Sequence, residues 1–87
     1  MAGDKNKNRT TVEIYGQRYV IAGTEPSSHI HLVADKVDLK MREIQSHNRF
    51  LDSKQLAVLT AVNTMSEYLK IKEELKKLQQ RIGKEES

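Results

Sequence analysis

The stretch from Leu51 to Ile82 constrains this chain more than any other, because it contains neither proline nor glycine. Its apolar residues settle into alternating steps of three and four, the spacing of a coiled-coil seam. At about 1.5 Å per residue, such a helix spans roughly 45 Å, which exceeds the diameter of a compact domain of this size. The chain alone cannot cover a helix of that length, and we therefore expect a second chain to pack against it.

Two apolar stripes follow this helix over different lengths. The predicted dimer seam continues backwards to Ala57 and consists of Ala61, Thr64, Tyr68, Ile71, Leu75, Leu78 and Ile82. The second stripe lies beside its first half only and consists of Val58, Val62, Met65 and Leu69. A wide apolar arc is typical of a helix packed in a globular domain, whereas a narrow arc suffices for one partner helix. We therefore expect the first half to pack in a head domain and the second half to meet a partner chain.

Local sequence signals mark both ends of the long helix. Asp52 suits the N-cap and Gln55 follows three residues later, so each side chain can accept a hydrogen bond from the backbone N–H of the other residue. Gly83 is the expected stop, because glycine is common just beyond helix ends. These signals predict a helix at about residues 53–82.

A β-hairpin is predicted at about residues 10–23. Gly16-Gln17 supplies a two-residue loop with glycine in the leading position, as in a type II′ turn. This loop sets Ile14 opposite Tyr19, and the implied register places four apolar side chains on one face: Val12, Ile14, Tyr19 and Ile21. A lone two-stranded hairpin is barely stable in water. Its apolar face must therefore lie on a helix, or its edge must pair with another chain.

A first helix is predicted at about residues 27–46, with either Thr24 or Ser27 as its cap. Apolar residues recur there at steps of three and four and predict one buried stripe: Ile30, Val33, Val37, Met41 and Ile44. Leu32 and Leu39 lie towards the opposite side of this helix. They form either an exposed or intersubunit patch or the margin of a broader core stripe, and the sequence leaves both alternatives open.

Together these elements predict a dimeric α+β protein with four segments. They are a disordered tail at 1–9, a small α+β head at 10–69, a projecting coiled-coil end at 70–83 and a disordered end at 84–87. Phe50, in the short connection between the two helices, is expected to turn back against them.

The composition limits what such a chain can do. With 37% apolar residues, one Phe and no Trp, the core is small for an isolated monomer, so we expect oligomerisation to supplement it. There is no Cys to form a disulfide or a reactive thiol. No run approaches the eighteen or so apolar residues that span a bilayer, and we expect a cytoplasmic protein.

Residues that commonly carry catalysis or bind metals do not form a constellation in this sequence. His29 and His31 are two positions apart at a helix start, so their rings diverge, and no carboxylate pair completes a metal shell. Ser27 and Ser28 lack a neighbouring base and an orienting acid. We therefore expect no catalytic residue, no metal site, no cofactor and no enzymatic activity.

Two classes of function remain. In the first, a dimeric head presents the same charged surface twice and cross-links a polymeric partner, because two linked sites gain strength through effective concentration. In the second, a small basic dimer binds nucleic acid, consistent with a net charge of +3. Basic residues alternate with acidic ones and stacking aromatics are scarce, which favours the first class.

Three blocks of the chain resemble the ZapA family of bacterial cell-division proteins, in the family's order. They are residues 11–21 (TVEIYGQRYVI), 28–44 (SHIHLVADKVDLKMREI) and 54–63 (KQLAVLTAVN). The resemblance covers about residues 10–78 and is greatest to the short members from Bacillus-related bacteria. It implies a non-catalytic cytoplasmic protein of the division site that binds FtsZ, bundles its protofilaments and promotes assembly of the Z-ring.

The resemblance also implies an oligomer with FtsZ-facing residues on the head. Longer members form tetramers through their tails, whereas the limited tail length here favours a homodimer over a tetramer. The head positions that match by location are charged or polar: Gln17, Arg18, Lys36, Lys40, Arg42, Glu43 and Arg49. We expect two or three of them to contribute to FtsZ binding.

Overall fold

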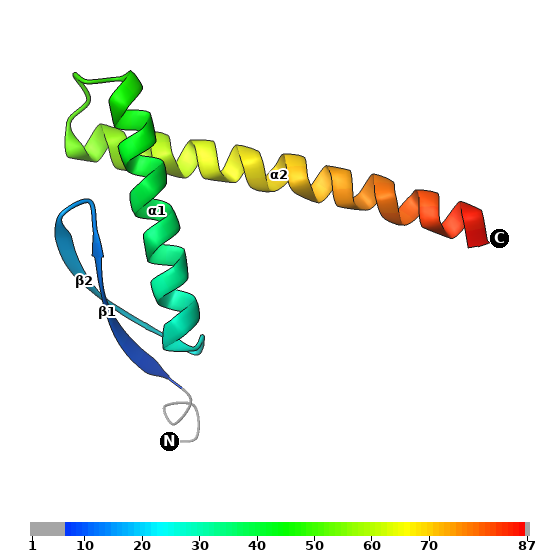
Figure 1. Ribbon diagram of the computed structural model, residues 1–87, viewed down its shortest axis with the longest axis horizontal. Helices are drawn as coiled ribbons and strands as arrows, with labels where there is room; N and C mark the ends of the chain where they lie inside the picture. The colour runs from blue at the N-terminus through cyan, green and yellow to red at the C-terminus, as the bar shows by residue number, and fades with distance from the viewer. Residues whose placement is uncertain (1–6, 87) are drawn as a thin grey trace.

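A computed structural model describes residues 7–86 of the chain and shows the predicted α+β arrangement (Figure 1). The elements in order are β1 (Asn8–Ile14), β2 (Gln17–Gly23), α1 (Ser27–His47) and α2 (Ser53–Glu86). Helix α1 packs along the hairpin, and α2 crosses α1 near its own start and then runs far beyond it (Figure 1). The radius of gyration is 17.6 Å, whereas a compact chain of this length has about 12 Å.

The two strands pair antiparallel around a Tyr15-Gly16 turn, not the predicted Gly16-Gln17 loop. Both turn residues have positive φ, 49° at Tyr15 and 79° at Gly16, as a type I′ turn requires. Ile14 therefore pairs with Gln17 and Val12 with Tyr19, so the predicted register is wrong by two residues. Because side chains alternate with a period of two, this shift leaves the predicted apolar face intact.

The hairpin and α1 bury a narrow core between them. On β1, Thr10 and Val12 are buried, and on α1 the buried residues are Ala34, Met41 and Ile44. Val33, predicted to be in the buried stripe, is 43% exposed, and the smaller Ala34 is 3% exposed instead. The stripe predicted on α1 is therefore wrong at this one position. A small side chain suits the place where helix and strand backbones approach each other.

Helix α1 begins without a side-chain cap. Its N-cap residue is Pro26, whose carbonyl accepts the N–H groups of His29 and Ile30 at 3.0 and 3.1 Å. Neither of the two predicted caps, Thr24 and Ser27, serves this role. Ser27 is already the first helical residue, and its hydroxyl lies 2.9 Å from that of Thr10, so it links α1 to β1.

Helix α2 begins at the predicted capping box. The Gln55 N–H donates to Asp52 Oδ1 at 2.8 Å, and the Asp52 N–H donates to Gln55 Oε1 at 3.3 Å. Gly83 does not end the helix, which continues to Glu86. Glycine lowers helix stability by only about 1 kcal/mol relative to alanine, and no proline follows to break the hydrogen-bond ladder.

The boundaries of the predicted ends also shift. Asn8 and Arg9, expected in a disordered tail, belong to β1, and residues 84–86, expected in a disordered end, belong to α2. Lys7 has no regular secondary structure, and residues 1–6 and 87 of those two predicted segments lie outside the described part of the chain.

Little of α2 is buried within its own chain. Leu56 and Thr60 are buried and Leu59 is partly buried, all in the first quarter of the helix. The second stripe, predicted to pack in the head, is exposed at each of its positions: Val58, Val62, Met65 and Leu69. That prediction is wrong within a single chain, because α1 crosses α2 instead of lying along it (Figure 1).

Several apolar side chains outside α2 are also exposed. Leu32 and Leu39 are more than half exposed, which excludes the broader core stripe and leaves the exposed patch. Phe50 does not turn back against the helices and is fully exposed, contrary to expectation. Its neighbour Leu51 packs against the core instead.

Candidate functional site

An apolar groove lies in the angle between the hairpin, α1 and the first half of α2. Its volume is about 910 Å³. The walls combine residues of the predicted apolar sheet face with residues of the predicted seam, among them Tyr19, Ile21, Val37, Met41, Ala61 and Tyr68. We call this feature the head groove. It is lined mainly by apolar side chains, so it suits an apolar protein segment better than a charged small molecule.

The predicted dimer seam continues directly from the head groove. Ala57, Ala61, Thr64 and Tyr68 line the groove, and the remaining seam residues follow along α2. Those remaining residues are all more than half exposed: Ile71, Leu75, Leu78 and Ile82. Groove and seam therefore form one apolar surface that runs from the head to the end of the helix. Contiguous exposed apolar surface of this kind marks a protein–protein contact.

The charged candidates do not converge on one site. Lys36, Lys40 and Glu43 are spaced by four and three residues and share one face of α1. The Lys40 ammonium is partly buried and forms an ion pair with Glu67 of α2. The hydrogen bond that Lys40 donates to the Glu67 carboxylate raises the pKa of Lys40 above its ordinary value. Lys40 therefore joins the two helices, whereas Lys36 and Glu43 form no ion pair within the described residues.

Arg42 has an internal role in the hairpin contact. Its Nε donates to Asp38 Oδ2 at 2.9 Å, and its guanidinium lies 5.5 Å from the centroid of the Tyr15 ring. Asp38 Oδ1 also accepts the Tyr15 backbone N–H at 2.6 Å. The hydrogen bond from Arg42 and then that from Tyr15 lower the pKa of Asp38 below its ordinary value. We call these three residues the turn clamp, because they hold the hairpin turn against α1.

The other candidates lie in the hairpin and in the connection between α1 and α2. Gln17 and Arg18 begin β2, where the Gln17 side-chain oxygen accepts a hydrogen bond from the Tyr19 hydroxyl at 3.0 Å and Arg18 pairs across the ladder with Glu13. Arg49 lies in the α1–α2 connection. The structure thus brings together three candidates on α1 and leaves Gln17, Arg18 and Arg49 at separate places.

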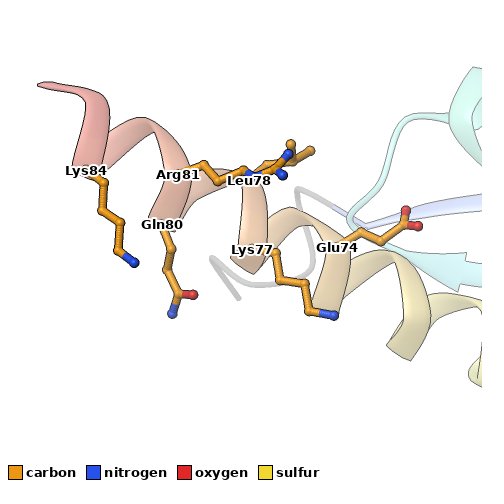
Figure 2. A pocket seen from close by; sticks show the side chains of 6 residues that line it. All are labelled: Glu74, Lys77, Leu78, Gln80, Arg81 and Lys84. Atoms are coloured by element: carbon orange, nitrogen blue, oxygen red, sulfur yellow. The ribbon is translucent and has the colours of Figure 1, made fainter.

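A second hollow, of about 660 Å³, lies on the projecting end of α2 (Figure 2). Figure 2 shows that its lining side chains all come from this one helix and that Lys77, Gln80 and Lys84 extend from the same side of it. A hollow between side chains of one helix has no opposing wall. It is therefore a solvated helix surface.

Within residues 7–86, no three His, Asp or Glu side chains lie close enough to hold a metal ion. His29 and His31 are both exposed at the start of α1. Neither α1 nor α2 combines the length and the apolar character that crossing a membrane requires.

Sequence reasoning missed the residues that act through tertiary contacts. Asp38, beside Lys36 and Lys40, is typical of a solvated helix surface, and Glu67 was not singled out, yet each joins two elements. Asp38 has a local partner in Arg42 at i+4 and Glu67 has one in Lys70 at i+3, so nothing in the sequence distinguished their long-range contacts. The head groove could not be predicted from the sequence either, because it depends on the angle between the two helices.

These features define a small α+β head carried on one long amphipathic helix, with an apolar surface left uncovered along that helix. The family model described as "Cell division protein ZapA" matches residues 10–86. The ZapA protein of Geobacillus sp. (strain WCH70) is 56% identical over 82 residues, which is 94% of each chain. That of Bacillus licheniformis is 54% identical over 79 residues, covering 91% of this chain and 93% of the relative.

A solved structure is also similar to this one. It is described as a ZapA mutant dimer from Geobacillus stearothermophilus, with a TM-score of 0.70 and 51% identity, and it covers 87% of this chain and 88% of its own. The chain therefore belongs to the ZapA family of cell-division proteins.

Proposed function

We propose that this chain is a non-enzymatic cell-division protein that forms a homodimer, binds FtsZ and cross-links or bundles its protofilaments to promote Z-ring assembly. It would act in the cytoplasm at the division site and need no cofactor. Membership of the ZapA family supports a role in cell division, and the similar solved structure from Geobacillus stearothermophilus is described as a dimer.

The observation that carries the proposal is the continuous apolar surface formed by the head groove and the α2 seam. A second copy offers a matching surface, because a two-fold axis sets the same patch of each chain against its equivalent. The narrow 3,4 stripe beyond Leu69 suits one partner helix, and the groove would receive apolar residues at the head end. The proposed division into a head at 10–69 and a projecting end at 70–83 follows from this pairing.

Dimerisation gives a physical basis for bundling. Each chain contributes one head, so a dimer carries two identical binding surfaces at a fixed separation. A second head bound to a neighbouring protofilament joins two filaments, and the local concentration of sites along a polymer strengthens the second contact. A monomeric chain would bind a filament without linking it to another.

The charged residues proposed to face FtsZ divide into two groups on the structure. Lys40 and Arg42 engage Glu67 and Asp38, so reversing their charge would disturb the head as well as any contact. Among residues 7–86, Lys36, Arg18 and Arg49 make no ion pair, which makes them the sharper candidates for contact with an acidic partner.

The proposal is tested by adding the purified chain to FtsZ polymerised with GTP. Light scattering and pelleting at low centrifugal force report bundles, and sedimentation velocity of the chain alone reports its oligomeric state. We expect a dimer that raises both bundling signals and enters the pellet with FtsZ. A folded chain that stays in the supernatant and leaves scattering unchanged would exclude FtsZ cross-linking.

A further inference from the structure

Phe50 presents its entire side chain to water. It is 102% exposed and is the single Phe of the chain. Arg49 beside it is also exposed and forms no ion pair within residues 7–86. An apolar ring held in water is unfavourable, and aromatic and arginine side chains are the two types most enriched at the energetic centres of protein interfaces.

The backbone holds this pair in a fixed presentation. The Leu51 N–H donates to the Asn48 carbonyl at 3.3 Å and closes a turn in which Arg49 and Phe50 are the two central residues. On the α1 side, the Asn48 side-chain amide donates to the Ile44 carbonyl at 3.3 Å. The two central residues of the turn project outward, while the residues on either side are held by hydrogen bonds. The backbone of the turn therefore loses little conformational entropy on binding.

The α2 side of the turn is fixed as well. Leu51 packs against the core, and the capping box of Asp52 and Gln55 begins α2 directly afterwards. The Asp52 carboxylate accepts the Gln55 N–H and is therefore engaged within the helix start. Arg49 and Lys54 outnumber this one carboxylate, so the charge around the ring is net positive.

This turn lies away from the surface assigned to the second copy. In Figure 1, α2 starts between the hairpin below it and the α1–α2 connection above it. The head groove opens on the hairpin side and includes neither Arg49 nor Phe50 in its lining. A partner chain seated in the groove and on the seam would leave the turn uncovered in both copies.

We propose that Arg49 and Phe50 form the anchor by which each head docks on an acidic surface of the partner that contains an apolar pocket for the ring. A hollow of about 440 Å³ beside the ring, lined by residues 46–51, would receive a side chain from the partner in return. The inference rests on the proposed function, in which that partner is the FtsZ filament, and it adds the chemistry of the contact.

The test compares binding to GTP-polymerised FtsZ by cosedimentation across a concentration series, for the full chain in each case. Phe50→Ala is expected to raise the concentration for half-maximal binding about 30-fold, the effect of losing an interface anchor. Phe50→Tyr keeps the ring and should stay within about threefold of wild type. Arg49→Glu should weaken binding more at low salt than at high salt, because its effect is electrostatic.

Leu32→Ala is the matched control, because it removes another exposed apolar side chain from the head, far along α1 from the turn. It is expected to bind like wild type. Unchanged binding by Phe50→Ala would overturn the anchor, and so would a loss of dimer in sedimentation velocity, which would assign Phe50 to the contact between copies. Absence of binding by the wild-type chain would instead overturn the proposed function and the anchor with it.

Discussion

At the scale of single residues, the turn clamp determines how the hairpin sits on α1. Tyr15 adopts a positive φ that non-glycine residues rarely take, and its N–H is held by the Asp38 carboxylate at 2.6 Å. Arg42 then completes the clamp from the same helix face as Asp38. A turn that the sequence alone placed one residue later is thus selected by a charge 23 residues further along the chain.

The clamp gives stability a specific dependence on pH. The pKa of Asp38 is lowered in the folded protein from its ordinary value of 3.8. The folded state therefore binds fewer protons at this site than the unfolded state, and the stabilisation is fully present above about pH 5. It is lost as the pH falls through the lowered pKa, where the carboxyl becomes protonated in the folded protein as well.

We therefore predict that Asp38→Asn lowers the urea midpoint of unfolding at pH 7 and that the difference from wild type shrinks as the pH falls below about 4. Circular dichroism at fixed protein concentration measures both midpoints, since self-association makes stability depend on concentration. Asp35→Asn, on the same helix and without a hydrogen bond in the described chain, is the control and should differ little from wild type. A pH-independent difference for Asp38→Asn would contradict the electrostatic role.

Residue-level prediction from sequence worked where the physics is local. The reciprocal hydrogen bonds of Asp52 and Gln55 involve residues three apart, and the structure confirms them. The apolar face of the hairpin was also recoverable, since it depends only on the alternation of side chains. The register depends on whether Tyr15-Gly16 or Gly16-Gln17 forms the turn. The tertiary contact between Tyr15 and Asp38 favours the first of these two turns.

At the scale of elements, α2 is one continuous helix of 34 residues. Its first turns pack in the head, and most of the helix beyond them is exposed in the single chain. Its periodicity predicted the existence of the helix, its start and both stripes. The sequence favoured the second stripe as the one packed in the head, although apolar residues dominate both stripes between Ala57 and Leu69. The head buries neither in full: Leu56 and Thr60 fill the contact with α1, and both stripes remain exposed in the single chain.

The seam can be tested apart from the head. Ile71→Glu with Leu75→Glu places two charges where two copies are proposed to meet, and burying unpaired charge costs several kcal/mol. We predict that the double variant weakens self-association more than 100-fold, corresponding to about 3 kcal/mol. Sedimentation velocity across a dilution series measures this change.

The control for added charge is Ser66→Glu with Gln80→Glu, two exposed α2 positions outside the seam. It adds the same two charges and should remain associated like wild type. An intact dimer in the seam variant would show that the head groove alone holds two copies together. Helix content by circular dichroism must match wild type in both variants.

At the scale of the whole molecule, the angle between the head and the long helix could not be predicted from the sequence. It depends on where α1 crosses α2, on the Lys40–Glu67 ion pair and on the short connection that holds Phe50 outward. Each of these features depends on contacts between residues far apart in the sequence. Residues nearer in the sequence looked equally suitable as contact partners. The resulting shape, 52 × 45 × 18 Å, separates the α1–α2 turn from the far end of the seam.

This separation predicts that binding and bundling can be uncoupled. A monomeric Ile71→Glu, Leu75→Glu chain keeps its head, and therefore its proposed FtsZ contacts, but carries one binding surface instead of two. It should pellet with FtsZ filaments at high centrifugal force with weaker apparent affinity, because the gain from effective concentration is lost. Added in excess to wild type, it should occupy filament sites and reduce light scattering from bundles. If the monomeric chain bundles filaments by itself, one head must contact two filaments, and cross-linking by dimers would be the wrong mechanism.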